Sequence, residues 1–265
     1  MSSGNQTATA SEPGAWGTAL EAVLFDMDGL LVDSEPLWFE VEHEVMKRLG
    51  GKWTAADQRK LVGGSLHTSV DYLIGRGTRR ASRDEVAGWL IGGMADLLAD
   101  REIIIMPGAA NLLAEVTAAG IPRALVTSSE RVIMDAVLAS LARYGISFTV
   151  TVCGADVTHP KPHPEPYLRA ASLIGADPRA CVALEDSPNG VAAARAAGCV
   201  TVAVPGVAQV PEGPGLTIAR SLTEVDLATL RALVASRSQV RFHGHGQHIG
   251  TQAQHPGEWE HRFTT

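Results

Sequence analysis

Short apolar runs alternate with amphipathic segments along most of the chain. Runs that predict β-strands occupy residues 22–25, 123–126, 148–152, 181–184 and 200–204. They are almost continuously apolar, which is typical of strands buried on both faces of a parallel sheet. Helical patterns lie between them, at residues 108–119, 164–173 and 188–197, and each is followed by a glycine, the residue preferred just past a helix end. This alternation predicts an α/β fold with a doubly wound, Rossmann-like parallel sheet.

The stretch between the first and second predicted strands has a different pattern. Residues 34–105 have helical periodicity and no strand signal, so we expect an inserted all-helical cap. Two patterns typical of helix N-termini support this interpretation: Thr54 with Asp57, and Ser82 with Glu85. An insert joined by two short connections can move as a lid.

The two ends of the chain differ from the rest in composition. Residues 1–19 are rich in small and polar residues and lack the basic and apolar regions of a secretory signal. Residues 236–265 are polar and rich in histidine, without periodicity. The predicted plan is a disordered lead at 1–19, a core built from 20–33 and 106–235, a helical cap at 34–105, and a flexible tail at 236–265.

Charge and apolar content exclude several classes of function. The formal net charge of −7 disfavours binding to nucleic acid or anionic lipid. No apolar run approaches the ~20 residues of a membrane span. Cys153, Cys181 and Cys199 are odd in number and lie in or beside apolar runs, so we interpret them as buried thiols in a reducing compartment. We therefore expect a cytoplasmic protein with no membrane partner.

Polar residues that could carry chemistry follow three of the predicted strands. Asp26 and Asp28 follow the first, Thr127 and Ser128 the second, and Glu185 with Asp186 the fourth. Ligands of open parallel sheets bind outside the carboxyl ends of the strands. Taken alone, each group is also explained as a solvated turn or a helix cap.

A lysine between prolines adds a cation to this set. Lys161 lies in the sequence His-Pro-Lys-Pro-His-Pro, which restricts its backbone and could aim its charge at a fixed point. A plain polar loop explains the segment equally well. Together, however, the four groups supply a nucleophile, an acid/base, a cradle for a divalent cation and a cation for phosphate oxygens. Phosphoryl transfer needs this combination of positioning and charge neutralisation.

The ordered motifs resemble a known superfamily over residues 20–210. The opening AVLFDMDGLLVDSEPLW, from Ala22 to Trp38, and the motif EDSPNG, from Glu185 to Gly190, are similar to the haloacid dehalogenase phosphohydrolases. Within them, the β-phosphoglucomutase-like and sugar-phosphatase-like branch is the most similar.

The resemblance implies a role for each motif residue. Asp26 would be the nucleophile that forms an aspartyl-phosphate, and Asp28 the general acid/base. Thr127, Ser128 and Lys161 would bind the phosphoryl oxygens. Mg²⁺ would be held by Asp26, the Asp28 backbone carbonyl and Asp186, with Glu185 in support.

The resemblance also leaves alternatives open. The mutases of this branch carry a histidine where this chain has Trp38, and they grip a second phosphate with basic residues in a cap loop. The matching loop here has no basic residue other than His67. We therefore expect a phosphatase that hydrolyses a small phosphate monoester such as a sugar phosphate, with Trp38, Ser65 and His67 as candidate substrate-selecting residues. The alternatives are a β-phosphoglucomutase-type phosphomutase and a binding protein without turnover; the sequence is compatible with a monomer.

Overall fold

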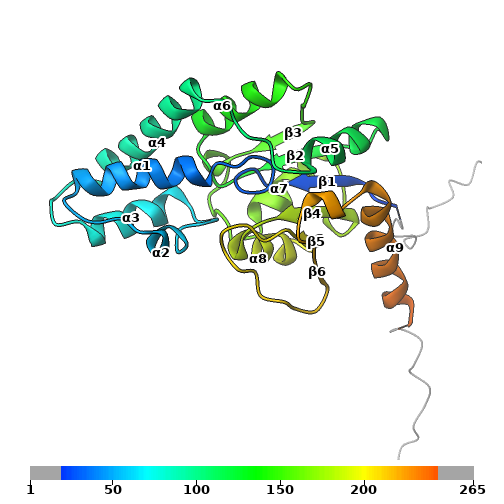
Figure 1. Cartoon of the computed structure of the whole chain (residues 1–265). Helices are drawn as coiled ribbons and strands as arrows, with labels where there is room; N and C mark the ends of the chain where they lie inside the picture. The colour runs from blue at the N-terminus through cyan, green and yellow to red at the C-terminus, as the bar shows by residue number, and fades with distance from the viewer. Residues whose placement is uncertain (1–18, 244–265) are drawn as a thin grey trace, which may run out of the picture.

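A six-stranded, all-parallel sheet forms the centre of the protein (Figure 1). The computed structural model describes residues 19–243, and the strand order is β3-β2-β1-β4-β5-β6. The strands are β1 (Ala22–Phe25), β2 (Arg123–Val126), β3 (Val150–Val152), β4 (Cys181–Glu185), β5 (Val200–Ala203) and β6 (Leu216–Ile218). Phe25 at the end of β1 lies opposite Leu125 of β2 and Leu184 of β4, so these three strands end at the same edge.

Helices cover both faces of this sheet, as a doubly wound fold requires. Alternate side chains of β1 point to opposite faces: Ala22 and Leu24 belong to one apolar cluster, Val23 and Phe25 to another. The first cluster includes side chains of α7 (Glu165–Ile174) and α8 (Pro188–Ala196). The second includes side chains of α5 (Ala109–Ala118), α6 (Arg131–Ala142) and α9 (Leu227–His243).

Four consecutive helices follow β1 and lie together beyond the sheet, on the left in Figure 1. They are α1 (Glu35–Arg48), α2 (Ala55–Gln58), α3 (Leu66–Arg76) and α4 (Arg83–Asp100). Both predicted capping boxes are present, at Thr54 for α2 and at Ser82 for α4. The chain enters and leaves this helical segment side by side, because Val32 and Ile105 form an antiparallel bridge.

The predicted parallel α/β fold is confirmed, and several elements match closely. The strands at 22–25 and 123–126 have the predicted bounds. Strand β6 and helices α6 and α9 were not identified from the sequence. Helix α9 continues to His243, so the first residues of the predicted tail are helical; residues 1–18 of the predicted lead and the rest of the tail lie outside the described residues.

Two further expectations concern residues that the structure describes. All three cysteines are free and buried, as predicted. No helix within residues 19–243 has the length and apolar character needed to cross a membrane.

Candidate active site

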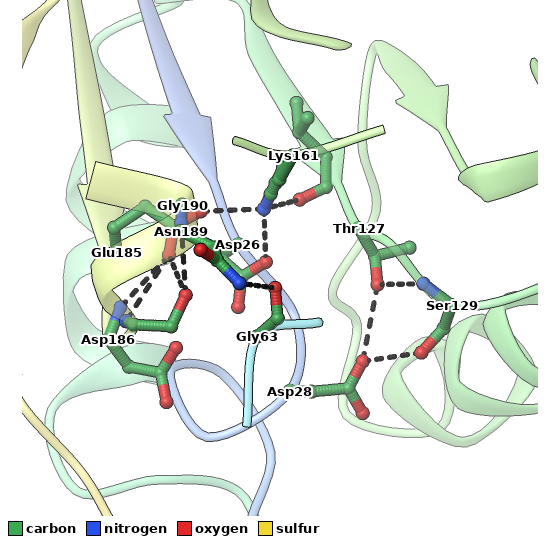
Figure 2. Close-up of polar contacts among 12 residues, drawn as sticks. Asp26, Asp28, Gly63, Thr127, Ser129, Lys161, Glu185, Asp186, Asn189 and Gly190 are labelled. Atoms are coloured by element: carbon green, nitrogen blue, oxygen red, sulfur yellow. Dashed lines mark hydrogen bonds and ion pairs between the residues drawn. The ribbon is translucent and has the colours of Figure 1, made fainter. Parts of the chain in front are cut away.

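The carboxyl ends of β1, β2 and β4 bring the polar groups of three motifs together, as Figure 2 shows. Asp26 follows β1 directly, Thr127 follows β2, and Glu185 is the last residue of β4. Each of the three side chains is at least nine-tenths buried. Positions that are 159 residues apart in the sequence thus share one small site, because parallel strands present the same ends to the same edge.

Lys161 lies at the centre of this group and is 4 % exposed. Its Nζ donates hydrogen bonds to Asp26 Oδ1 at 2.6 Å, to Glu185 Oε1 at 2.6 Å and to the backbone oxygen of Val126 at 2.9 Å. Tyr167 of α7 donates its hydroxyl to the same Glu185 oxygen at 2.5 Å. The three donors of the ammonium are therefore all used, and the charge is fixed beside Asp26.

Asp28 is held by four side-chain donors. Its Oδ1 accepts hydrogen bonds from Ser34 at 2.6 Å and from the indole of Trp38 at 3.3 Å. Its Oδ2 accepts from Thr127 at 3.2 Å and from Ser129 at 2.7 Å. The carboxylate is thus positioned jointly by the start of α1 and by the loop after β2.

Two glycines allow the loops to approach this closely. Gly29 has φ +78°, and a Cβ there would lie 2.2 Å from Asp186 Oδ2. A Cβ on Gly190 would lie 1.9 Å from the Glu185 carboxyl carbon. Glycine is needed at both positions, at the first for backbone conformation and space and at the second for space alone.

The electrostatics of the site are dominated by buried negative charge. Burial, followed by the neighbouring Glu185 carboxylate, raises the pKa of Asp26 well above its usual range, and Lys161 only partly opposes this. The pKa of Asp186 is raised in the same way, by burial and then by Asp26 and Glu185. Burial disfavours the charged form of Lys161, but Asp26 and Glu185 outweigh it and raise the pKa of the ammonium. One cation thus faces several buried carboxylates, and a further cation would relieve their repulsion.

The carboxylates suit a hard divalent cation such as Mg²⁺. One ligand atom from each of Asp26, Glu185 and Asp186 lies within 4.8 Å of the other two. The Asp186 Oδ2 atom is buried and has no hydrogen-bond partner. A buried carboxylate oxygen is costly to leave unpaired, and carboxylate oxygens are the ligands that Mg²⁺ prefers. Both Glu185 oxygens already accept protein hydrogen bonds, so this residue is suited to support the site.

A cleft opens beside Asp26 towards the helical segment and has an empty volume of about 710 Å³, including its mouth. Asp26, Asp28, Thr127, Ser128 and Lys161 line its inner end. The Ser128 hydroxyl is buried without a partner, which leaves it available to a ligand.

The candidate substrate-selecting residues do not all lie in this cleft. Trp38 lines it, but Ser65 and His67 do not. The Ser65 hydroxyl caps α3 instead, and His67 is exposed. Residues three apart share a helix face, so Leu66 and Ser69 are the α3 residues that reach the cleft.

Sequence reasoning missed several residues of the site. Glu35, Glu42 and Gln58 line the outer part of the cleft, and Tyr167 supports Glu185. The seven-residue spacing of Glu35 and Glu42 on one helix was a usable signal, since it places both on one face. No local pattern marks Gln58 or Tyr167, which the tertiary fold brings to the site.

The protein is thus a doubly wound α/β fold whose strand ends carry two aspartates, a buried lysine and an acidic corner formed by Asp26, Glu185 and Asp186. The family profile described as haloacid dehalogenase-like hydrolase matches residues 20–198. The chain therefore belongs to the haloacid dehalogenase-like hydrolase family, as its motifs predicted.

Named relatives place it in the sugar- and metabolite-phosphatase branch of that family. Hexitol phosphatase B of Escherichia coli K12 is 32 % identical over 81 % of this chain and 94 % of the relative. A probable pseudouridine-5'-phosphatase of Drosophila melanogaster is 31 % identical over 69 % of this chain and 80 % of its own length. The crystal structure of CbbY from Rhodobacter sphaeroides in complex with phosphate has a TM-score of 0.73, with 29 % identity over 80 % of this chain and 99 % of that one.

Proposed function

We propose that this protein is a Mg²⁺-dependent phosphatase that hydrolyses a small phosphate monoester, such as a sugar phosphate, through an aspartyl-phosphate on Asp26. One observation carries the proposal: the buried Lys161 ammonium bonds both Asp26 and Glu185, while Asp186 beside them keeps an unpaired buried oxygen. The relatives named as phosphatases support a phosphoric monoester hydrolase.

In the first half-reaction, an Asp26 carboxylate oxygen forms a bond to phosphorus as the bond from phosphorus to the ester oxygen breaks. The leaving oxygen takes a proton from the Asp28 carboxyl group, so the alcohol departs neutral. Hydroxyl donors on both Asp28 oxygens hold this group next to the cleft.

In the second half-reaction, Asp28 takes a proton from a water molecule as the water oxygen bonds to phosphorus. The bond between phosphorus and Asp26 then breaks, which releases inorganic phosphate and regenerates the Asp26 carboxylate. The Asp28 carboxyl group is protonated again, so the cycle closes without a further reactant.

The remaining residues of the inner cleft would bind and orient the phosphoryl group. Thr127 and Ser128 would contact its oxygens through their hydroxyls, and Lys161, whose three N–H donors are held by protein oxygens, would stabilise them through its charge. Asp26, Asp186 and the Asp28 backbone carbonyl would hold Mg²⁺, which when bound neutralises charge on the phosphoryl oxygens. Lys161 bonds one oxygen of Asp26 and one of Glu185. Its positive charge would therefore neutralise part of the negative charge around the bound cation.

We propose that the α1–α4 segment acts as a cap that excludes water from the phosphorylated intermediate. Its loop residue Gly63 accepts a hydrogen bond from Asn189 of α8 at 3.3 Å, which joins the segment to the sheet side of the cleft. The cytoplasmic location stays a prediction.

A phosphomutase is less compatible with this cleft. A mutase must also bind a second phosphate, and Lys161 is the only basic side chain among the described residues that line the cleft. Net hydrolysis needs only one phosphate site.

Release of inorganic phosphate from a panel of monoesters, including p-nitrophenyl phosphate and sugar monophosphates, tests the proposal. We expect turnover that requires Mg²⁺ and disappears in Asp26→Asn. Wild-type turnover no greater than that of Asp26→Asn would contradict it. Accumulation of an isomerised sugar phosphate in place of free phosphate would favour the mutase.

A further inference from the structure

The loop before α7 carries a second group of metal-ligating side chains, outside the cleft. His159, His163 and Glu165 each offer one ligand atom, and these atoms all lie within 4.8 Å of one another. None of the three lines the cleft, although Lys161 between the two histidines does. The proposed phosphoryl transfer therefore gives this group no role.

The side chains of His159 and Glu165 already face a common point. His159 Nδ1 donates a hydrogen bond to Glu165 Oε2 at 2.8 Å, so one proton joins the imidazole to the carboxylate. Metal ions bind deprotonated imidazole and carboxylate groups and displace protons of this kind. A cation could therefore take the place of this proton with little movement of either side chain.

The His163 ring lies against the His159 ring, with the two ring centroids 4.6 Å apart. Its Nδ1 accepts the backbone N–H of Glu165 at 3.2 Å, so ligation through Nδ1 would replace only this long hydrogen bond. In a tetrahedral zinc site, bonds of about 2.0–2.1 Å place the ligand atoms roughly 3.3 Å apart. Both imidazoles are exposed, and rotation of these side chains can bring the three ligand atoms to that separation.

The backbone of this loop is ordered by its own residues. Every second residue from 160 to 164 is proline, which restricts the chain between the ligands. Glu165 Oε1 accepts the Thr158 N–H at 2.8 Å, and Oε2 accepts the His159 N–H at 3.0 Å. The hydrogen bond from Thr158, followed by that from the His159 ring, lowers the pKa of Glu165, so the carboxylate is charged at neutral pH. A loop ordered in this way loses little conformational entropy when it binds an ion.

We propose that His159, His163 and Glu165 form a site for a first-row transition ion such as Zn²⁺, separate from the acidic corner. Two imidazole nitrogens and one carboxylate oxygen are typical Zn²⁺ ligands, and a water molecule would complete the tetrahedral set. Mg²⁺ prefers oxygen ligands, so the acidic corner and this site would select different ions. The inference goes beyond the proposed function and does not depend on it.

The position of the site would brace the segment that holds Lys161. His159 and His163 precede and follow this lysine by two residues, and their rings are exposed while the lysine is buried. The ammonium bonds Asp26 and Glu185 on the inner side of the loop. A cation bound to both imidazoles would cross-link the loop on its outer side. An ion that binds only the folded state adds stability by mass action, so Zn²⁺ should raise Tm even when Mg²⁺ is in excess.

Zn²⁺ titration of the full chain by calorimetry, with Mg²⁺ in excess, tests the site. Five further histidines could compete for the ion, so every comparison uses a full-length parent chain in which they are changed to glutamine: His243, His245, His248, His255 and His261. We expect His159→Gln/His163→Gln to bind one equivalent of Zn²⁺ fewer than this parent. The matched control, His43→Gln/His67→Gln, removes two exposed histidines of α1 and α3 and should bind as much Zn²⁺ as the parent.

Thermal unfolding gives a second readout on the same chains. Zn²⁺ should raise Tm of the parent and of the control, and leave Tm of His159→Gln/His163→Gln unchanged. Cooperative unfolding of that variant without Zn²⁺ shows that it is folded. Glu165→Gln should weaken Zn²⁺ binding by at least the roughly 10-fold that is lost when a hydrogen-bond partner of a metal ligand is removed.

Equal Zn²⁺ stoichiometry in the parent and in His159→Gln/His163→Gln would overturn the inference, and so would an equal rise in Tm. Neither readout uses turnover. A failure of this inference would therefore leave the proposed phosphatase function untouched, and an inactive protein could still bind Zn²⁺ as predicted.

Discussion

At the scale of single residues, Lys161 connects Asp26 to Glu185. It bonds Asp26 and Glu185 at 2.6 Å each and is itself almost fully buried. Its carboxylate partners would otherwise repel each other in a region of low dielectric. The same side chain therefore stabilises the fold locally, and in the proposed reaction it would also position charge beside Asp26.

Lys161→Met should impair both roles. We expect kcat/KM to fall about 100- to 1,000-fold, in the range for loss of one positioned electrostatic group. The free energy of unfolding should fall by about 3–5 kcal/mol, because two buried carboxylates lose their cation. Phosphate release and chemical denaturation measure the two effects, with the exposed Lys47→Met as control.

Adding Glu185→Gln to Lys161→Met should recover part of the lost stability, since one of the two unpaired carboxylates is removed. A double variant as unstable as the single one would show that the ion pairs are not the source of the effect.

Glu42 gives a pH-dependent prediction at the same scale. Burial, followed by the charge of Glu35, raises its pKa from 4.5 in the unfolded chain to about 8 in the folded protein. As pH rises, the Glu42 carboxyl group loses its proton at a lower pH in the unfolded chain than in the folded protein. The free energy of unfolding therefore falls as pH rises from about 4.5 to 8 and then levels off. At about 1.4 kcal/mol per pKa unit, the cost at high pH is on the order of a few kcal/mol.

Glu42→Gln should therefore raise Tm much more at pH 8.5 than at pH 5. Glu44→Gln on the exposed face of α1 should show no such difference. Parallel Tm curves for wild type and Glu42→Gln across this range would mean that Glu42 is not a destabilising buried acid.

Individual site residues could be predicted from sequence only where a local pattern marked them. Asp26, Asp28, Lys161 and Asp186 stand at strand ends or between prolines, and the structure brings them together. Ser65 does not line the cleft and its hydroxyl caps α3, so a role for it in selecting substrate stays a prediction. Gln58 and Tyr167 carry no local signal, since their partners are 23 and 18 residues away along the chain.

At the scale of elements, the start of α8 packs directly against Glu185 of the acidic corner. Ser187 caps the helix by accepting a hydrogen bond from the Gly190 N–H at 3.1 Å, while Glu185 packs against Gly190. The helix can begin this close to the end of β4 only because position 190 has no side chain.

Gly190→Ala should consequently destabilise the protein and reduce turnover, as its Cβ would displace the Glu185 carboxyl group. Gly88→Ala is the matched control: Gly88 lies inside α4, and a Cβ there meets nothing within 4 Å. That substitution should stabilise by about 0.5–1 kcal/mol. Thermal unfolding and phosphate release report both results, and equal stability of the two variants would contradict this packing.

Elements with strong local signals were predicted well, and weaker ones were missed. Strand β1 is a run of four apolar residues fully buried between two helical layers, so its pattern is unambiguous. Strand β6 has three residues at the sheet edge, none of them fully buried, and pairs only with β5 among the described strands. This segment is therefore a strand because it pairs with β5, and its own sequence gives little indication of it.

At the scale of the whole molecule, cation binding should be linked to stability. Asp186 has a buried oxygen without a hydrogen-bond partner. Burial, followed by neighbouring carboxylates, raises the pKa of Asp26 and of Asp186, so this acidic corner is destabilised without a cation. A cation that binds only the folded state adds stability by mass action.

Mg²⁺ should raise Tm by roughly 5–10 °C at about 100 times its Kd, and chelator should reverse the shift. Asp186→Asn should abolish the shift and, without Mg²⁺, be at least as stable as wild type, because an unpaired buried charge is gone. A full Mg²⁺ shift in Asp186→Asn would place the cation elsewhere.

The fold class and family could be predicted at this scale, but the shape of the cleft could not. Motif order along the chain indicated the parallel sheet and the strand-end site. The outer part of the cleft depends on how α1 and α2 pack together. The hydrogen bond from Gln58 to Glu35 results from that packing. Long-range arrangement of this kind is not encoded in any single segment.

Rapid chemical quench of the Mg²⁺-loaded enzyme with a ³²P-labelled monoester would detect the proposed phosphoryl group on Asp26. An acyl phosphate survives acid and is cleaved by hydroxylamine, so the account predicts a transient, hydroxylamine-labile label on the peptide that contains Asp26. The label should be absent from Asp26→Asn and from chelator-treated enzyme. Phosphate release by wild-type enzyme with no label on Asp26, or with the label on another residue, would contradict the account.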